Sequence, residues 1–165
     1  MARRLLLLGA LVALVIIVVG ALLYFRARTG APATAGTSGG WYDIYFTDPK
    51  YPDRPENRHG GIDEKFVAFL DTAQRSLDVA IYDFDLDDAA DALVRAKGRG
   101  VAVRIVMDSD TLDNTKDQDI VRAVGKLKQA GIPIVGDNRQ PIMHDKFVVR
   151  DGEEVWTGSW NFTTG

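Results

Sequence analysis

The chain has 165 residues, of which 46% are hydrophobic and 26% are charged, and its formal net charge is −3. This length suits one domain with accessory segments, because domains most often have roughly 100 to 150 residues. The absence of cysteine excludes disulfides, cysteine metal sites and a thiol nucleophile.

An uncharged stretch, Leu5 to Phe25, lies near the N-terminus. About 20 apolar residues span a bilayer core as a helix, so residues 1–28 are expected to form a single-pass membrane anchor with basic flanks. The alternative is a cleaved secretory signal, but the apolar region of such signals typically has about 7 to 15 residues. We expect an uncleaved anchor with the rest of the chain on the extracytoplasmic side, although arginines on both flanks leave the orientation open.

Residues 29–40 are small, uncharged and rich in Gly and Pro, which predicts a flexible linker before a domain of residues 41–165. Without the four arginines of residues 1–28, the remainder has 16 basic and 23 acidic residues, a net charge of −7. An acidic domain has no general attraction to nucleic acid, although a local basic pocket can still exist.

Hydrophobic periodicity alternates between the helical and the strand type along this domain. Asp87 is expected to cap the second helix, and an aspartate, Asp108, ends the second strand. The alternation predicts an α/β fold with a largely parallel sheet. The predicted elements are helices over 62–74, 87–98 and 117–130 and strands over 77–84, 101–108 and 132–135.

The acidic stretch from Asp108 to Asp119 does not fit the calcium loop of an EF-hand. Leu112 and Asp113 occupy the positions where that loop needs an acidic or amide group and then a glycine. We expect a loop at a strand end, followed by a helix cap. His59, in a loop rich in Pro and Gly, is expected to be a surface residue.

Asp151-Gly152 lies between two strand-like segments and predicts a β-hairpin with a two-residue loop. In that register Arg150 pairs with Glu153, and Lys146 pairs with Thr157. Side chains alternate between the faces of a strand, so one face should be polar and the other apolar. The expected polar face carries His144, Lys146, Thr157, Ser159 and Asn161, and the apolar face carries Met143, Phe147, Val149, Trp156 and Trp160.

Each of these polar residues alone is more often structural, but together they suit phosphoryl chemistry. A neutral imidazole such as that of His144 is nucleophilic near pH 7 and can form a covalent phospho-intermediate. Lys146 would neutralise charge on the phosphate oxygens, while Asn161, and less directly Ser159, could donate hydrogen bonds to them. A second acid must protonate the leaving alkoxide, and the sequence does not identify it.

The segment from His144 to Asn161 resembles the HKD motif of the phospholipase D superfamily, H-x-K-x4-D-x6-G-S-x-N. The resemblance extends upstream to 41–49, 76–85 and 99–110, which look like core strands of the family. It implies a layered α/β/α sheet domain, here one half-repeat, and a phosphodiesterase that needs no metal or other cofactor. It also implies that His144 is the nucleophile or its acid partner, that Lys146 and Asn161 bind phosphate, and that Asp151 supports the catalytic site. The residues that match the motif are His144, Lys146, Asp151, Gly158, Ser159 and Asn161.

Active sites of this family need two such motifs, and the sequence has one. The second motif would come from a symmetric homodimer or from a further half of a longer chain. Three hypotheses follow. The first is a membrane-anchored phospholipase D-type enzyme that hydrolyses phospholipid head groups, the second is a nuclease of the same type, and the third is a membrane-tethered binding module without activity. The net charge of residues 29–165 weighs against the nuclease.

Overall fold

A computed structural model describes residues 37–47, 51–52, 54 and 60–164. The described residues divide into two compact units between Gly61 and Ile62. The predicted anchor, 1–28, lies outside them, and none of the helices in the described part is long and apolar enough to cross a membrane. In the first unit, β1 (Thr37–Ser38) pairs antiparallel with β2 (Asp43–Ile44), so the end of the predicted linker forms part of a small hairpin.

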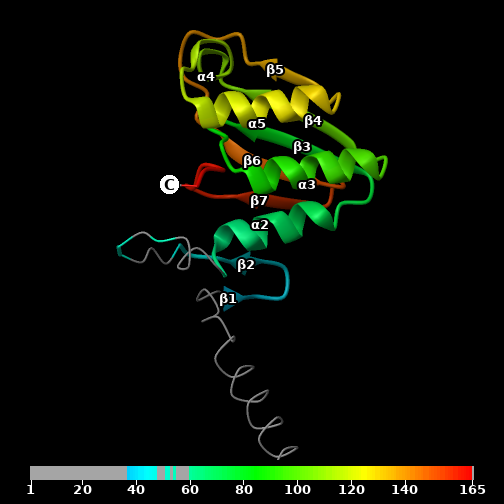
Figure 1. Cartoon of the computed structure of the whole chain (residues 1–165). Coiled ribbons are helices and arrows are strands. Elements are labelled where there is room, and N and C mark those ends of the chain that lie inside the picture. Colours follow the sequence, from blue (N-terminus) through cyan, green and yellow to red (C-terminus); the bar gives the residue numbers. More distant parts are fainter. Residues whose placement is uncertain (1–36, 48–50, 53, 55–59, 165) are drawn as a thin grey trace, which may run out of the picture. The chain divides into compact units, whose positions relative to one another are not determined.

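The second unit contains a five-stranded mixed sheet in the order β5-β4-β3-β6-β7 (Figure 1). The first three strands in sequence are parallel, as predicted, but the hairpin of β6 and β7 joins β3 in the antiparallel direction. The loop between β5 and β6 contains no crossover helix, so the chain turns back and pairs antiparallel. The strands are β3 (Ser76–Ile81), β4 (Ala102–Met107), β5 (Ile134–Gly136), β6 (Lys146–Arg150) and β7 (Glu154–Thr157).

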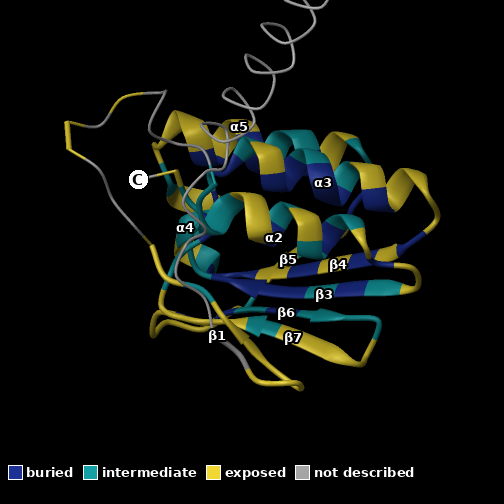
Figure 2. Cartoon of the chain, turned by 90° about the horizontal axis from the view of Figure 1, so that it is seen from below, coloured by how far each residue is buried: buried dark blue, intermediate teal, exposed yellow. Residues whose placement is uncertain are grey.

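Three helices cover one face of this sheet (Figures 1 and 2). They are α2 (Ile62–Asp71), α3 (Asp87–Gly98) and α5 (Gln118–Gln129). Residues of β4 alternate between exposed and buried, because only one face of the strand meets the helices. The resemblance implied a helical layer on both faces of the sheet. Within residues 60–164, helices cover one face only.

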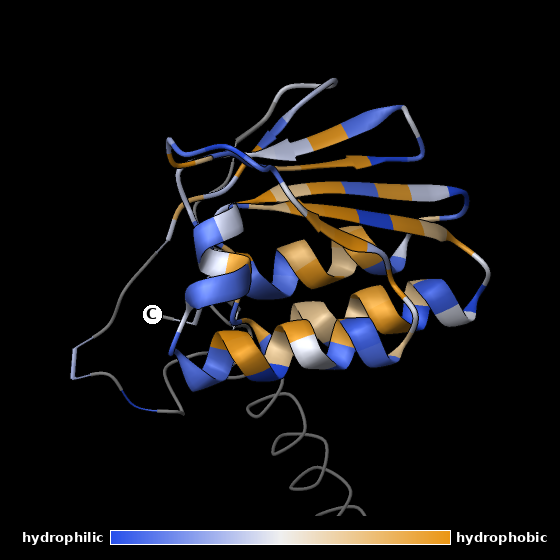
Figure 3. Cartoon of the chain, turned by 90° about the horizontal axis from the view of Figure 1, so that it is seen from above, coloured by the Kyte–Doolittle hydropathy of each residue, from blue (hydrophilic) through white to orange (hydrophobic). Residues whose placement is uncertain are grey.

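The hydrophobic core lies between these helices and the sheet, and hydrophobic residues of both layers face it (Figure 3). The helices supply Phe66, Leu70 and Leu93, and the strands supply Leu77, Ile81 and Met107, all at most 1% exposed. Burial of each such side chain contributes roughly 1.5 to 3 kcal/mol to folding. Since β3 is central and its last residues are deeply buried, the backbone at the C-terminal end of β3 is rigidly held.

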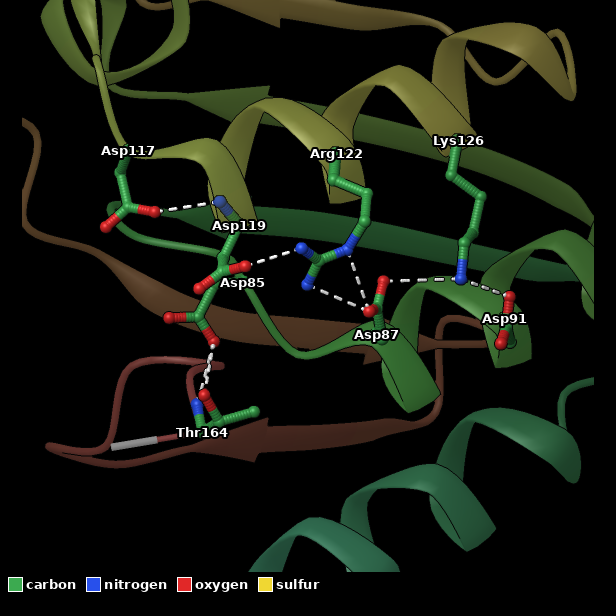
Figure 4. Close-up of polar contacts among 8 residues, drawn as sticks. All are labelled: Asp85, Asp87, Asp91, Asp117, Asp119, Arg122, Lys126 and Thr164. Carbon is green, nitrogen blue, oxygen red and sulfur yellow. Dashed lines mark hydrogen bonds and ion pairs between the residues drawn. The ribbon is translucent and has the colours of Figure 1, made fainter.

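An ion-pair network joins α3 to α5 across the surface of the helical layer (Figure 4). Arg122 of α5 donates to Asp87 over 3.0 Å, and Lys126 donates to Asp91 over 2.7 Å. Asp87 was expected to cap α3, but the cap position is occupied by Leu86, which makes no side-chain capping bond. The carboxylate of Asp87 instead lies in the first turn and pairs with the two cations of α5.

The acidic stretch 108–119 contains a short helix that the sequence analysis did not predict. Asp108 is the N-cap of this helix, α4 (Ser109–Asn114), and its side chain accepts a hydrogen bond from the Thr111 N–H. The expected cap before the next helix is confirmed, because Asp117 accepts from the Asp119 N–H at the start of α5. The aspartate directly after a buried strand, a residue type favoured at the N-cap, was the signal in the sequence that could have indicated α4.

The register of the closing hairpin is shifted by one residue from the prediction. Asp151 and Gly152 form the expected turn, with φ of 56° and 71°, and the Glu153 N–H donates to the Arg150 carbonyl. The ladder, however, begins one residue later, so that Arg150 lies opposite Glu154 and Thr157 lies opposite Phe147. The turn thus includes Glu153 as well as Asp151 and Gly152, and the Asp151 N–H continues the pairing with β3 by donating to the Ser76 carbonyl.

This shift changes which side chains share a face, because a slip of one residue exchanges the two faces of a strand. Val148 is fully buried under the helices, whereas Phe147 and Val149, expected on the apolar face, are only half-buried. Thr157 lies on the face away from Lys146, contrary to the prediction, since Lys146 lies opposite the buried Ile81.

Candidate active site

The C-terminal end of β3 and the N-terminal end of β6 meet at one edge of the sheet. Ile81 pairs with Lys146, and the Tyr82 N–H donates to the Asp145 carbonyl over 3.0 Å. This antiparallel pairing brings the residues after β3 together with those just before β6. The candidate catalytic residues His144 and Lys146 therefore lie beside Tyr82.

The segment after β7 returns to the same edge through its backbone. Phe162 forms a parallel bridge with Phe84, and its carbonyl accepts from the N–H groups of Asp85 and Leu86. The Asp85 carboxylate also accepts from the Thr164 N–H over 2.8 Å (Figure 4). These bonds place Asn161, the residue before the bridge, alongside the end of β3.

His144 is solvent-exposed, and its imidazole packs edge-on against the ring of Tyr82, with the two centroids 4.9 Å apart. The imidazole makes no hydrogen bond to any described residue, so within the described part of the chain both ring nitrogens are open to a ligand. The backbone is well held, because the His144 carbonyl accepts from the Lys146 ammonium over 3.1 Å. An open imidazole on a fixed backbone suits a nucleophile.

Lys146 is 7% exposed, which is rare for a lysine. Its Nζ lies 5.5 Å from the centroid of the Tyr82 ring and uses one of its three donors on His144. Burial lowers the pKa of Lys146, and the carboxylates of Asp145 and Asp83 oppose that shift. A buried ammonium with donors to spare is prepared to bind an anion.

Two buried oxygens at this edge have no hydrogen-bond partner among the described residues, Oδ1 of Asn161 and Oδ1 of Asp83. Burial raises the pKa of Asp83, and the nearby carboxylates of Asp85 and Asp117 raise it further. Unpaired buried polar atoms cost about 1 to 3 kcal/mol each, so they are uncommon outside functional sites. Ser159 is exposed just beyond the end of β7.

Asp151 lies at the opposite end of β6, on the order of 20 Å along the strand from His144 at about 3.3 Å per residue. Its carboxylate accepts hydrogen bonds from the N–H groups of Gln74, Arg75 and Ser76. These bonds, led by that from Ser76, lower the pKa of Asp151. The side chain thus fixes the hairpin to the loop between α2 and β3, away from the other motif residues.

A pocket of about 420 Å³ is lined in part by Tyr82, the residue whose ring contacts His144, and by Ile142, but His144 itself does not line it. Its remaining wall comes from α4 and from the loop that leads to β6. The charged groups that line it are three carboxylates, Asp108, Asp110 and Asp113, and one cation, Arg139. Arg139 already pairs with Asp137 over 2.8 Å, so the pocket as a whole is acidic.

The structure thus gathers His144, Lys146 and Asn161 at one edge of the sheet, with Ser159 nearby, and places Asp151 elsewhere. Sequence reasoning did not identify Tyr82, Asp83 or the pocket. Their signal was the run of polar residues directly after a buried strand, since ligands often bind at the carboxyl ends of parallel strands. Within the described residues, no three His, Asp or Glu side chains are arranged to hold a metal ion.

Residues 66–165 match a family model described as "Cardiolipin synthase, PLD-like domain". A protein of Chlamydomonas reinhardtii named mitochondrial cardiolipin hydrolase is 33% identical over 82% of this chain and 66% of its own length. A Xenopus tropicalis protein of the same name is 35% identical over 60% of this chain and 45% of its own length. The chain thus spans less than two-thirds of these curated relatives.

Two solved structures share the fold. Nuc from Salmonella typhimurium, titled a phospholipase D family member, is 35% identical and superposes with a TM-score of 0.58, covering 67% of this chain and 68% of its own. NucT from Helicobacter pylori is 24% identical, with a TM-score of 0.52 over 66% of this chain and 71% of its own. The mixed α/β sheet is therefore an architecture that these proteins have in common.

Proposed function

Because the chain belongs to the phospholipase D superfamily, we propose that it is a phosphodiesterase that hydrolyses phospholipid head groups through a covalent phosphohistidine. The observation that carries this proposal is the pairing of an exposed, unbonded imidazole, His144, with a buried ammonium, Lys146, against the same tyrosine ring. The two groups supply an open nucleophile and a charge for the phosphate oxygens.

In the proposed reaction, a ring nitrogen of His144 attacks phosphorus, and the P–O bond to the alcohol breaks. The alcohol oxygen leaves with its bonding electrons and takes a proton from a general acid. Water then attacks the phosphohistidine, loses a proton to that same group, and frees His144 with phosphatidic acid as the product. Lys146 and the amide of Asn161 stabilise the charge that gathers on the oxygens during both displacements. Ser159 and Asp151 have supporting roles.

The general acid is proposed to be the histidine of a second motif. A symmetric homodimer would bring a second His144 to the same phosphate, and a longer chain would bring a second half with its own motif. Asp83 is an internal alternative, because it lies close enough to Lys146 for their charges to interact and its pKa is raised.

Three features favour a phospholipid head group as the alcohol. The pocket that Tyr82 lines has a size typical of small-molecule sites, and its carboxylates suit a neutral or cationic alcohol better than a polyanion. Relatives named cardiolipin hydrolase support a lipid substrate. The uncharged segment 5–25 would hold the site near a membrane, with the domain on the extracytoplasmic side.

The nuclease remains the second candidate, because the phosphodiester chemistry is the same. Binding to nucleic acid depends mainly on positive charge, and residues 29–165 carry a net charge of −7. The binding module without activity is the third, favoured by the single motif alone.

The test is hydrolysis of bis-p-nitrophenyl phosphate by the full chain in detergent with excess EDTA. His144→Ala should abolish turnover, whereas His59→Ala, which changes the only other histidine, should leave it unchanged. Turnover that survives in His144→Ala would contradict the proposed nucleophile. Vesicles of phosphatidylglycerol and a single-stranded oligonucleotide, compared under the same conditions, then decide between lipid and nucleic acid.

A further inference from the structure

Asp108 is the most deeply buried carboxylate near the site, with 3% of its surface exposed, and no motif residue accounts for it. One oxygen, Oδ1, accepts from the Thr111 N–H over 3.0 Å and so caps α4. The other oxygen, Oδ2, accepts from the Met143 N–H over 3.0 Å, across 35 positions of sequence. A single carboxylate thus joins the end of β4, the start of α4 and the residue before His144.

The second of these bonds bears directly on the candidate nucleophile. The backbone around His144 is fixed at two points, the Met143 N–H held by Asp108 and the Asp145 carbonyl held by the Tyr82 N–H. The imidazole itself has no hydrogen bond to a described residue, and its one described ring contact is with Tyr82. Its direction is therefore set by the backbone on either side.

Helix capping alone does not explain this arrangement. A serine or threonine would cap a helix as short as α4 about as well as an aspartate and would avoid burying a charge. Burial pushes the pKa of Asp108 upward, but the bonds from the Met143 and Thr111 N–H groups outweigh it and leave the pKa lowered. The carboxylate therefore stays ionised, and both of its oxygens are needed.

We propose that Asp108 is a positioning residue, which holds the backbone at Met143 so that the His144 imidazole stays packed against Tyr82. The proposal rests on the proposed function only in naming His144 as the nucleophile. A shift of about 1 Å in a reacting group can cost on the order of 100-fold in rate, so the bond to Met143 would matter for catalysis without touching substrate.

Asp108→Ser separates the two bonds, because a serine caps α4 but is too short to reach Met143 as well. The matched control is Asp71→Asn. Asp71 ends α2, near the other end of β3, and its carboxylate accepts hydrogen bonds from Arg95 of α3. Both variants are first compared in urea unfolding, so that any loss of stability is known.

The first measurement is the NMR signal of the His144 Hε1 proton in the full chain, which needs no catalytic activity. The chain has two histidines, so the signal is assigned by its absence from His144→Gln. In the wild type the Tyr82 ring should displace this signal from its position in the urea-unfolded chain. Asp108→Ser should move it towards the unfolded position, and Asp71→Asn should leave it in place.

The second measurement is turnover of bis-p-nitrophenyl phosphate. Asp108→Ser should lower kcat by on the order of tenfold to 100-fold with KM within about twofold of the wild type. A wild-type signal and a wild-type kcat in Asp108→Ser would overturn the proposal and reduce Asp108 to a helix cap. If the wild type has no turnover, the proposed activity of this chain by itself fails, and the NMR signal alone decides the role of Asp108.

Discussion

The polar groups at the two ends of β6 differ in how fully they are hydrogen-bonded. At the Arg150 end, the Asp151 carboxylate accepts from three backbone N–H groups, and Arg150 donates to the Phe69 carbonyl over 2.9 Å. At the Lys146 end, the His144 imidazole and one oxygen each of Asn161 and Asp83 have no hydrogen-bond partner in the described part of the chain.

This difference separates two kinds of motif residue that the sequence alone presents as equals. Satisfied polar groups stabilise a fold, whereas unsatisfied ones lower its stability and persist where a ligand will complete them. Asp151 therefore belongs with the structural end of the hairpin, and His144, Lys146 and Asn161 lie at the other end, where the phosphate site is proposed. Four substitutions test this division.

The largest effect is expected from Lys146→Met. Loss of the ammonium should lower kcat/KM for a phosphodiester by on the order of 100-fold to 1000-fold. Burial lowers the pKa of Lys146, which means that the charged form is less stable in the folded protein, so the free energy of unfolding should stay the same or rise by about 1 kcal/mol. Steady-state kinetics and urea unfolding measure the two quantities. Lys128→Met, on the exposed side of α5, is the control, and a clear loss of stability in Lys146→Met would break the comparison.

Asp151→Ala should affect stability more than activity. It should lower the free energy of unfolding by about 2 to 3 kcal/mol, because three N–H groups lose a charged acceptor. The folded-state pKa of Asp151 lies below its ordinary value of 3.8. Its contribution is therefore fully present above that value and is lost as pH falls through the lowered pKa.

Urea unfolding of the wild type and Asp151→Ala from pH 7 to pH 2.5 measures this dependence. The difference in unfolding free energy should be largest at neutral pH and shrink in acid. Activity per folded molecule should remain within about tenfold of the wild type, since Asp151 acts through the fold. A loss as deep as that of Lys146→Met would place Asp151 with the catalytic residues.

Asp83→Asn should have a smaller effect and the opposite pH dependence. Burial raises the pKa of Asp83 above its unfolded value, so the charged carboxylate destabilises the folded protein at neutral pH. The neutral amide should raise stability by about 1 kcal/mol at pH 7, and the gain should vanish as pH falls below the unfolded value, where both states are protonated. If Asp83 also supplies the proton for the leaving alcohol, this variant loses activity as well as its dependence on pH.

The smallest effect is expected from Glu153→Gln. Its carboxylate pairs with Arg75 over 2.5 Å, but the two side chains are 62% and 70% exposed for Arg75 and Glu153 respectively. Surface ion pairs contribute roughly 0 to 1 kcal/mol, so stability should fall by less than about 0.5 kcal/mol, and less still in 0.5 M salt. Thermal unfolding at low and high salt measures the change. A larger loss would mean that the Arg75–Glu153 ion pair stabilises the loop between α2 and β3 as much as the hydrogen bonds of Asp151 do.

Local pattern in the sequence was enough for the α/β class, the three long helices, the strands and the turn at Asp151-Gly152. It also predicted a site at His144, Lys146 and Asn161, because their spacing matches a motif, and the roles of these residues stay a prediction. The hairpin register failed at one residue, because the turn includes Glu153, which the Asp-Gly pattern by itself does not indicate. Asp87 failed as a cap for a similar reason, because Arg122 and Lys126 of another helix hold its carboxylate.

What the sequence determined by itself is therefore the set of elements and the chemistry of the candidate site, because periodicity, turn residues and motif spacing are local properties of the chain. Only the tertiary structure decided which of the motif residues lie together and which additional residues join them. Tyr82 contacts His144, and Asp108 bonds the residue before it, through contacts that cross tens of residues of sequence. Such contacts depend on which strands become neighbours in the sheet. No local pattern encodes that choice, since it is made by the packing of the whole core.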